Sequence, residues 1–290
     1  MKNLILLLFI AFSLTTSFYY PQRQEIKFVK RIFDLNKKNE KAQFDNWVTI
    51  NLSNNSFDSI GKQYESKKVL KVSNKVSYPC FYEDERFEVY RKCNGEFGGA
   101  LFFKSKRTRK LHVLYCTCAV QVEYKNGGYF IVESMDHMIG TTCVFEIKDP
   151  TTLLSVSPKQ IETRVYGSSQ FNNNIKRNLL LQDTFNLYVS MLYQYKNHDF
   201  VIFTPHGNLC IGELINGKIS NSDTLLNQWL AIGRTTVKND FHINESKSIG
   251  GYYSHDLKYL TQKTTTGKIF VRNDTIIIGY SVNVETIKQK

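Results

Sequence analysis

The sequence predicts an all-β protein built as a meander of antiparallel hairpins. Aromatic residues make up 13% of the chain, with seventeen Tyr and twenty Phe, and such bulky rings favour half-buried sheet surfaces. From Trp47 onward, apolar residues alternate with polar ones at a period of two, which is the pattern of strands. Asn-containing turn signals separate these runs. We expect a β-propeller-like arrangement, with a large β-sandwich or barrel as the alternative.

Residues 1–17 have the pattern of a secretory signal peptide. Met1-Lys2-Asn3 carries positive charge, the apolar run Leu4 to Leu14 follows, and Thr15-Thr16-Ser17 supplies small residues for cleavage after Ser17. The run is too short for a membrane anchor, which needs about twenty apolar residues. No later segment reaches that length. We therefore expect a secreted, extracytoplasmic protein without a transmembrane segment.

Residues 18–46 are interpreted as a basic lead-in segment and residues 47–290 as a single all-β domain. Within the lead-in, Arg23 to Leu35 places apolar residues on one helical stripe with basic residues around it. This segment is expected to be a short docking helix or an irregular basic stretch. The length after the signal, about 270 residues, suffices for one large core.

Alternation indicates strands at Val48 to Leu52 and Phe185 to Tyr195. Leu111 to Tyr124 is apolar on both faces, as expected of a strand buried on both sides. Shorter strands are predicted at Thr142 to Lys148 and Leu209 to Leu214. Ser222-Asp223-Thr224, opening onto Leu225 to Leu230, predicts one brief helix.

Three turn signals join apolar runs into hairpins: Lys125-Asn126-Gly127-Gly128, Lys196-Asn197-His198-Asp199 and Arg272-Asn273-Asp274. A further one, Asn216-Gly217, closes the strand at 209–214. The three hairpins recur about seventy residues apart, and a loose repeat of about forty residues per sheet is typical of a propeller. About five or six blades would fit the length.

The formal charge of +12 favours contact with acidic surfaces such as polysaccharide, cell envelope or nucleic acid. The densest basic cluster comprises Lys104, Lys106, Arg107, Arg109 and Lys110. We interpret it as a polyanion patch or, alternatively, as a solvated hairpin turn between two apolar runs.

Six cysteines make disulfides feasible in an exported chain. Cys116 and Cys118 lie two apart in one apolar run, a spacing that on a strand does not allow them to bond to each other. Cys80, Cys93 and Cys143 are the alternative partners, and buried free thiols are the other outcome. Four N-x-Ser/Thr sequons, at Asn51, Asn54, Asn244 and Asn273, would matter only in a eukaryotic source.

The segment Cys93 to Leu101 resembles the Gly-Asp-Ser-Gly-Gly segment of chymotrypsin-like serine proteases, but the likeness fails at the nucleophile. Phe97 occupies the serine position, and a phenyl ring has no nucleophilic atom. The base histidine of that family precedes the nucleophile, whereas all six histidines here follow it. Protease activity by this route is excluded. Gly98 and Gly99 are instead expected to allow a close approach or bulge before the strand Ala100 to Phe103.

The same segment, with His137-Met138-Ile139-Gly140 and Glu146-Ile147-Lys148-Asp149-Pro150, resembles a pattern in uncharacterised exported bacterial proteins. These share a Gly-x-Phe-Gly-Gly hairpin and a His-Met-x-Gly turn, and the likeness covers roughly residues 93–153. It implies an extracellular β protein and transfers no catalytic residue.

The best candidates for chemistry are Asp136 and His137, with Glu96 as a further acid, because a carboxylate can orient an imidazole as a base. Adjacent strand residues point to opposite faces, so the pair could cooperate only in a turn. A histidine that hydrogen-bonds within the turn is the alternative.

No metal or cofactor site is predicted. Cys116, Cys118, Cys143 and His137 lack zinc-site spacing, and no phosphate-binding glycine loop indicates a nucleotide. We predict an exported binding module for an acidic glycan or envelope surface. A secreted glycosidase-like hydrolase on the same scaffold and a self-associating structural envelope protein are the alternatives, and the oligomeric state stays open.

Overall fold

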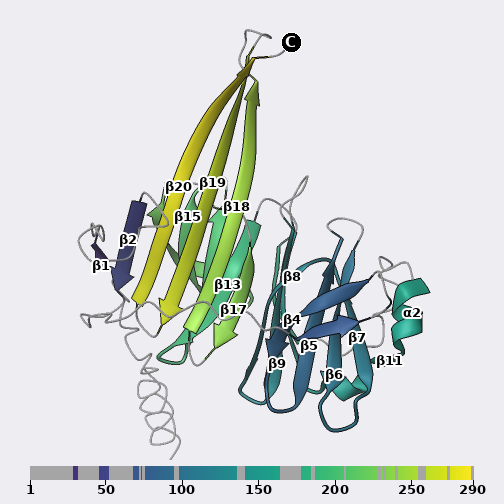
Figure 1. The fold of residues 1–290 in the computed structure, drawn as a ribbon. Coiled ribbons are helices and arrows are strands. Elements are labelled where there is room, and N and C mark those ends of the chain that lie inside the picture. Colours follow the sequence, from purple (N-terminus) through teal and green to yellow (C-terminus); the bar gives the residue numbers. More distant parts are fainter. Residues whose placement is uncertain are drawn as a thin grey trace, which may run out of the picture.

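The computed structural model describes residues 29–31, 46–51, 68–71, 73, 76–94, 98–135, 141–163, 178–183, 187–205, 207–227, 230, 233–238, 241–253, 259–272 and 275–288. These residues form four antiparallel sheets, which we number I to IV (Figure 1). Sheet I contains β3 (Val69–Lys71), β4 (Ser77–Glu83), β5 (Phe87–Cys93), β6 (Gly99–Ser105), β7 (Leu111–Cys116) and β11 (Leu154–Val156). Sheet II contains β8 (Ala119–Lys125), β9 (Gly128–Met135), β10 (Thr141–Ile147) and β12 (Asn178–Asp183).

Sheets III and IV follow in the chain. Sheet III contains β13 (Leu187–Tyr195), β14 (His198–Pro205), β15 (Leu209–Ile215) and β16 (Lys218–Leu226). Sheet IV contains β17 (Arg234–Lys238), β18 (Phe241–Tyr253), β19 (Tyr259–Arg272) and β20 (Thr275–Lys288), followed across the sheet by β2 (Asn46–Asn51) and β1 (Val29–Arg31). The described helices are η3 (Pro150–Thr152) and α2 (Pro158–Thr163). Strands β18 to β20 are long, and their far ends project beyond the other sheets (Figure 1).

The prediction of an all-β antiparallel meander is confirmed, because every recorded strand pair is antiparallel and most neighbours in a sheet are consecutive in the chain. Sheets I to IV hold six, four, four and six strands. A propeller is not shown by this strand order.

The four sheets pack face to face in chain order. Leu101 and Phe103 of sheet I pack in one core with Ile131 and Phe145 of sheet II. The next core joins sheets II and III, and includes Val132, Val144, Val189 and Val201. The third joins sheets III and IV, and includes Ile202, Ile211, Ile269 and Ile278. The packed parts of sheets II and III are therefore buried on both faces, which explains the nearly continuous apolar runs in β9 and β14.

The outer face of sheet I has a cover of its own. Val156 of β11 and Ile161 of α2 pack with Phe102 and Val113 in a separate buried cluster. The short helix therefore shields the end of the stack from water.

The predicted tight turns are confirmed by their backbone geometry. Asn126 and Gly127 have φ of 51° and 79°, and Asn216 and Gly217 have φ of 49° and 77°, as two-residue hairpin turns with positive φ require. Lys196 and Asn197 likewise have positive φ. The third predicted hairpin forms between β19 and β20, with Arg272 paired to Thr275.

Three sequence-based predictions of local structure are wrong. Leu111 to Tyr124 is not one strand, because β7 ends at Cys116 in sheet I and β8 begins at Ala119 in sheet II. The predicted start of a helix at 222–224 lies inside β16, where β15 pairing overrides the capping signal. Within the predicted docking helix, Val29–Arg31 is a strand paired with β2.

One strand from each sheet, β4, β8, β13 and β17, meets the others at what we call the central junction. Strand β17 lies against β4, β8 and β13, and β8 lies against β4 and β13. Backbone groups at such a meeting point must find partners, because a buried unpaired amide or carbonyl costs about 1–3 kcal/mol. Side chains from neighbouring sheets supply them.

Side-chain hydrogen bonds to backbone link the sheets at this junction. Gln121 of sheet II holds both backbone groups of Leu192 in sheet III, with its Nε2 2.7 Å from the carbonyl and its Oε1 2.8 Å from the amide. Thr235 Oγ1 of sheet IV donates to the Ser190 carbonyl of sheet III at 2.6 Å. Asn244 donates to the same carbonyl and is fully buried, so its sequon cannot carry a glycan in the folded protein.

A partly buried acid–base pair adds a direct link between sheets II and IV. His242 Nε2 lies 3.0 Å from Glu123 Oε2, and Gln121 donates to the same oxygen at 3.2 Å. Burial alone raises the pKa of Glu123, but the hydrogen bond and charge of His242, with Lys125 and Gln121, outweigh it and hold that pKa below its ordinary value. The carboxylate is therefore more acidic in the fold than in the unfolded chain.

We expect Gly99→Ala to lower the free energy of unfolding by about 1–3 kcal/mol. A methyl group at this position would overlap the backbone carbonyls of Lys92 and Thr117. Gly127→Ala is the control: it has open space around the added methyl but a φ of +79°, so it should cost about 1 kcal/mol. Urea unfolding measures both, and an undiminished midpoint for Gly99→Ala would contradict the close approach.

Glu123→Gln should reduce stability by about 2 kcal/mol at pH 7 and make the protein less sensitive to acid. A carboxyl whose folded pKa is depressed stabilises the fold above its unfolded pKa, near 4.5, and loses that contribution as pH falls through the folded pKa. Thermal unfolding between pH 3 and 7 measures the difference, with exposed Glu85→Gln as the control. Parallel curves for wild type and Glu123→Gln would refute the pairing.

Candidate functional site

A pocket of about 300 Å³ opens where β4 and β5 of sheet I meet the start of β17. One side is formed by Tyr78, Pro79 and Phe81, and Cys93 and Asn94 lie at the end of β5. The remaining lining residues are basic: Arg91, Lys92 and Arg234. None of the lining residues in the described part of the chain carries a carboxylate. The pocket therefore concentrates positive charge beside aromatic surface.

Two arginines lie over one aromatic ring in this pocket. The guanidinium carbons of Arg91 and Arg234 are 4.8 and 4.9 Å from the centre of the Phe81 ring. This cation–π geometry fixes both groups. Arg234 Nη2 also donates to the carbonyls of Cys80 and Phe81, at 2.8 and 2.9 Å. Arg234 thereby joins the last sheet to the first while it lines the pocket.

Burial and mutual repulsion both disfavour the charged forms of these side chains. Burial lowers the pKa of Arg91, and the neighbouring positive charge of Arg234 lowers it further. Burial also lowers the pKa of Lys92. Since a guanidinium remains charged in proteins, the repulsion between the arginines persists. An anion bound in the pocket would offset this repulsion, which makes the pocket a candidate anion site.

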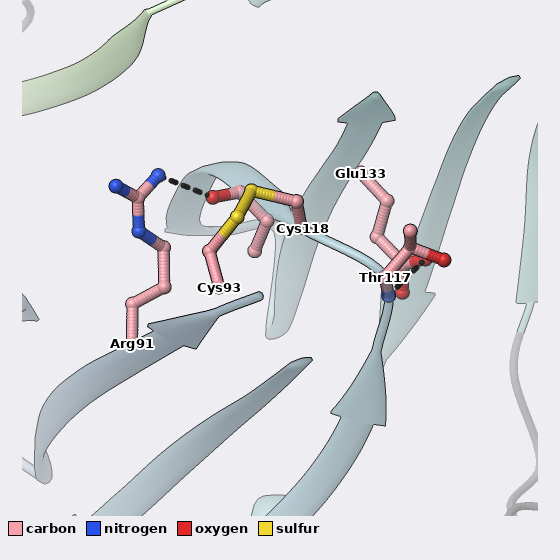
Figure 2. The surroundings of a disulfide bond; sticks show 6 residues. Arg91, Cys93, Thr117, Cys118 and Glu133 are labelled. Carbon is pink, nitrogen blue, oxygen red and sulfur yellow. Dashed lines mark hydrogen bonds between the residues drawn. A yellow bond between two sulfur atoms is a disulfide. The ribbon is translucent and has the colours of Figure 1, made fainter. Parts of the chain in front are cut away.

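A disulfide holds the rim of the pocket. Cys93 at the end of β5 is bonded to Cys118, with 4.9 Å between their Cα atoms, and Cys118 lies in the crossover from sheet I to sheet II (Figure 2). Arg91 Nη1 donates to the carbonyl of Ala119, the next residue, at 2.9 Å. The disulfide thus fixes the backbone that orients Arg91.

The crossover between β7 and β8 is also held by a hydrogen bond to sheet II. The Thr117 amide donates to Glu133 Oε2 at 3.3 Å (Figure 2). At the rim, Gly98 has a φ of 83°, and Gly99 approaches two backbone carbonyls. The predicted role of these glycines as a close approach is therefore confirmed.

Cysteine pairing is resolved by the structure. Of the alternatives left open, Cys118 pairs with Cys93, while Cys80, Cys116, Cys143 and Cys210 form no disulfide. Cys80, Cys116 and Cys210 are buried, as is common for small apolar residues.

The predicted basic cluster spans the β6–β7 hairpin. Lys104 pairs with Glu88 at 3.1 Å and Lys106 with Glu83 at 2.6 Å. The other three, Arg107, Arg109 and Lys110, are exposed in the turn. Two of the five charges thus have a carboxylate partner. None of the five residues lines the pocket described above.

The predicted catalytic candidates Glu96, Asp136 and His137 lie outside the described residues. Of the other His-Asp adjacencies, His198 pairs with Glu213 at 2.6 Å, and Asp199 pairs with Lys125 at 3.0 Å. His255-Asp256 lies outside the described residues. The described residues contain no group of three metal-ligating side chains.

Sequence reasoning missed Arg91 and Arg234. They belong to no motif, and Arg234 lies 154 positions from its partner Cys80. The only local signal was the placement of Arg91-Lys92 beside Cys93.

No family model matches the chain, and no curated protein matches it in sequence. In the part of the chain that the structure describes, no helix has both the length and the apolar character needed to cross a membrane.

Replacing both disulfide cysteines, Cys93→Ser with Cys118→Ser, should lower the free energy of unfolding by about 3 kcal/mol, because the bond closes a 25-residue loop. Denaturant unfolding without reductant measures the loss. The matched control is reductant itself, which should destabilise the wild type and leave the double variant unchanged. A wild-type midpoint that does not respond to reductant would contradict the bond.

Proposed function

We propose that this protein is an exported binding module that recognises an acidic ligand through the pocket of Arg91, Lys92 and Arg234. The observation that carries the proposal is the convergence of three cations on one pocket whose described lining has no carboxylate. The repulsion between the two arginines adds to it. An anion is the ligand that such a site would stabilise most.

Export is supported by two independent features. The first 17 residues have the pattern of a signal peptide. The disulfide Cys93–Cys118 belongs in an oxidising compartment. An acidic glycan or an anionic envelope surface is a common acidic partner there, and the chain's charge of +12 would attract either.

We also propose a propeller-like relation among the sheets. Support comes from the face-to-face packing in chain order and from the meeting of β4, β8, β13 and β17 at the central junction. In addition, β2 from the N-terminal part pairs with β20, so both ends of the chain contribute to sheet IV. The proposed pocket lies where sheets I and IV meet.

No observation on the described residues favours the hydrolase alternative. Glycoside hydrolysis uses a pair of carboxyl groups beside the scissile bond. The described lining of this pocket supplies cations and aromatic groups instead.

Retention of the mature protein on immobilised acidic polysaccharides tests the proposal. We expect retention at low salt that weakens as salt rises. Arg91→Gln should reduce affinity roughly tenfold or more, because a charged hydrogen bond contributes about 1.5–3 kcal/mol. The control variant Arg107→Gln removes one exposed charge from the β6–β7 turn and should have little effect.

Two outcomes of this experiment would count against the proposal. Absence of retention at low salt on every acidic matrix would refute the proposal. Retention that falls with Arg107→Gln and is unchanged by Arg91→Gln would move the binding surface from the pocket to the β6–β7 turn.

A further inference from the structure

The Cys93–Cys118 disulfide is accessible to solvent on the side of the pocket. Cys93 is exposed and lines the pocket, while its partner Cys118 is half-buried in the crossover between β7 and β8. Disulfides with a purely structural role resist reduction, whereas exposed ones are the labile or regulatory ones. Reduction of this bond would therefore take place in the wall of the pocket itself.

The bond ties the end of β5 to a crossover whose backbone is fixed on sheet II. Cys93 is the last residue of β5 and pairs with Gly99 of β6. In the crossover, the carbonyl of Cys118 accepts a hydrogen bond from the amide of Ser134 in β9 at 3.0 Å. Without the disulfide, the end of β5 keeps its ladder to β6 and loses its direct covalent link to the crossover.

Arg91 forms a second link between the same two segments. It lies two residues before Cys93 on β5, and its Nη1 donates to the carbonyl of Ala119, the residue after Cys118, at 2.9 Å (Figure 2). The disulfide and this hydrogen bond therefore bridge β5 and the crossover side by side. After reduction, the hydrogen bond of Arg91 has to hold its place without the covalent link beside it.

Repulsion between like charges makes Arg91 sensitive to that loss. The guanidinium carbons of Arg91 and Arg234 lie 4.8 and 4.9 Å from the centre of the same Phe81 ring. Burial and then the positive charge of Arg234 lower the pKa of Arg91. Two cations this close repel each other, so a looser anchor favours arrangements in which Arg91 lies further from Arg234. The positive charge in the pocket is then less concentrated, and an anion binds it more weakly.

From these features we propose that the Cys93–Cys118 disulfide is a redox switch for the pocket. The oxidised protein binds its acidic ligand more tightly than the protein reduced by a dithiol, because the intact bond holds Arg91 in place. This inference rests on the proposed function and goes beyond it by naming a chemical regulator of the same site.

The switching reaction is a thiol–disulfide exchange with an external dithiol. One thiolate of the dithiol attacks the exposed Cys93 sulfur, forms a mixed disulfide and displaces the Cys118 thiolate, which takes a proton. The second thiolate of the dithiol then attacks its own sulfur in the mixed disulfide and releases the Cys93 thiolate, which is protonated in turn. The dithiol is thereby oxidised to its disulfide, and the protein gains two electrons and two protons.

The affinity of the full mature chain for immobilised polygalacturonate and immobilised dextran sulfate, measured with and without dithiothreitol, tests the proposal. Reduction should weaken binding roughly fivefold or more, and reoxidation with oxidised glutathione should restore it. The double variant Cys93→Ser with Cys118→Ser should have the weaker affinity under both conditions. Cys143→Ser is the matched control: Cys143 forms no disulfide, so this variant should respond to dithiothreitol as the wild type does.

The variant Arg91→Gln separates control of the pocket from a general loosening of the fold. If the disulfide acts by holding Arg91, reduction should change the affinity of this variant by less than about twofold, measured at low salt where the variant is still retained. A reduced Arg91→Gln protein that loses the same factor as the wild type would overturn the proposal. Loss of the near-ultraviolet circular dichroism of the reduced wild type would also overturn it, because the bond would then support the whole fold.

The outcomes distinguish this inference from the proposed function. If the oxidised protein is retained and dithiothreitol leaves its affinity unchanged, the redox switch is wrong and the proposed function stands. If the oxidised protein is retained on neither matrix at low salt, the proposed function fails, and this inference fails with it.

Discussion

The fold depends on satisfying backbone groups where four sheets meet. Hydrophobic cores hold the sheets face to face, but at the central junction the strands approach without forming a common ladder. Side chains complete the pairing there: Arg91 links sheets I and II, Gln121 links II and III, and Thr235 links IV and III. Arg234 links IV back to I. These polar contacts specify which sheet lies next to which, a selectivity that apolar packing alone does not provide.

The candidate site arises where Arg234 joins sheet IV to sheet I. Arg234 must reach the carbonyls of β4 to join the last sheet to the first, and this brings its charge beside that of Arg91. The cost of holding two cations together is offset in part by the Phe81 ring that both contact. The structural role and the proposed binding role therefore fall on the same side chains, which is why this pocket has no motif of its own.

Local signals predicted local structure well. The turns at Asn126-Gly127 and Asn216-Gly217 are set by their own backbone preferences, and the all-β class follows from many alternating segments. The break between β7 and β8 was not predictable, because both strands are apolar on both faces and no Gly or Pro separates them. The regular spacing of the three predicted hairpins was also misleading. Two join the first and second strands of their meanders, whereas the third joins β19 and β20. The pairing of Cys93 and the meeting of Arg91 with Arg234 arise from tertiary packing, which single-sequence patterns do not encode.

Sheet IV takes strands from both ends of the chain, since β2 pairs with β20 along six residues. Loop-closure entropy makes contacts between such distant segments slow to form. During synthesis, β2 has β1 on one edge, but its other edge has no partner until β20 has emerged, long after sheets I to III are available to fold. In the interval, the exposed edge of β2 can pair with other chains. The topology therefore constrains the order in which sheet IV is completed: β2, made early, must wait for a strand made long after it.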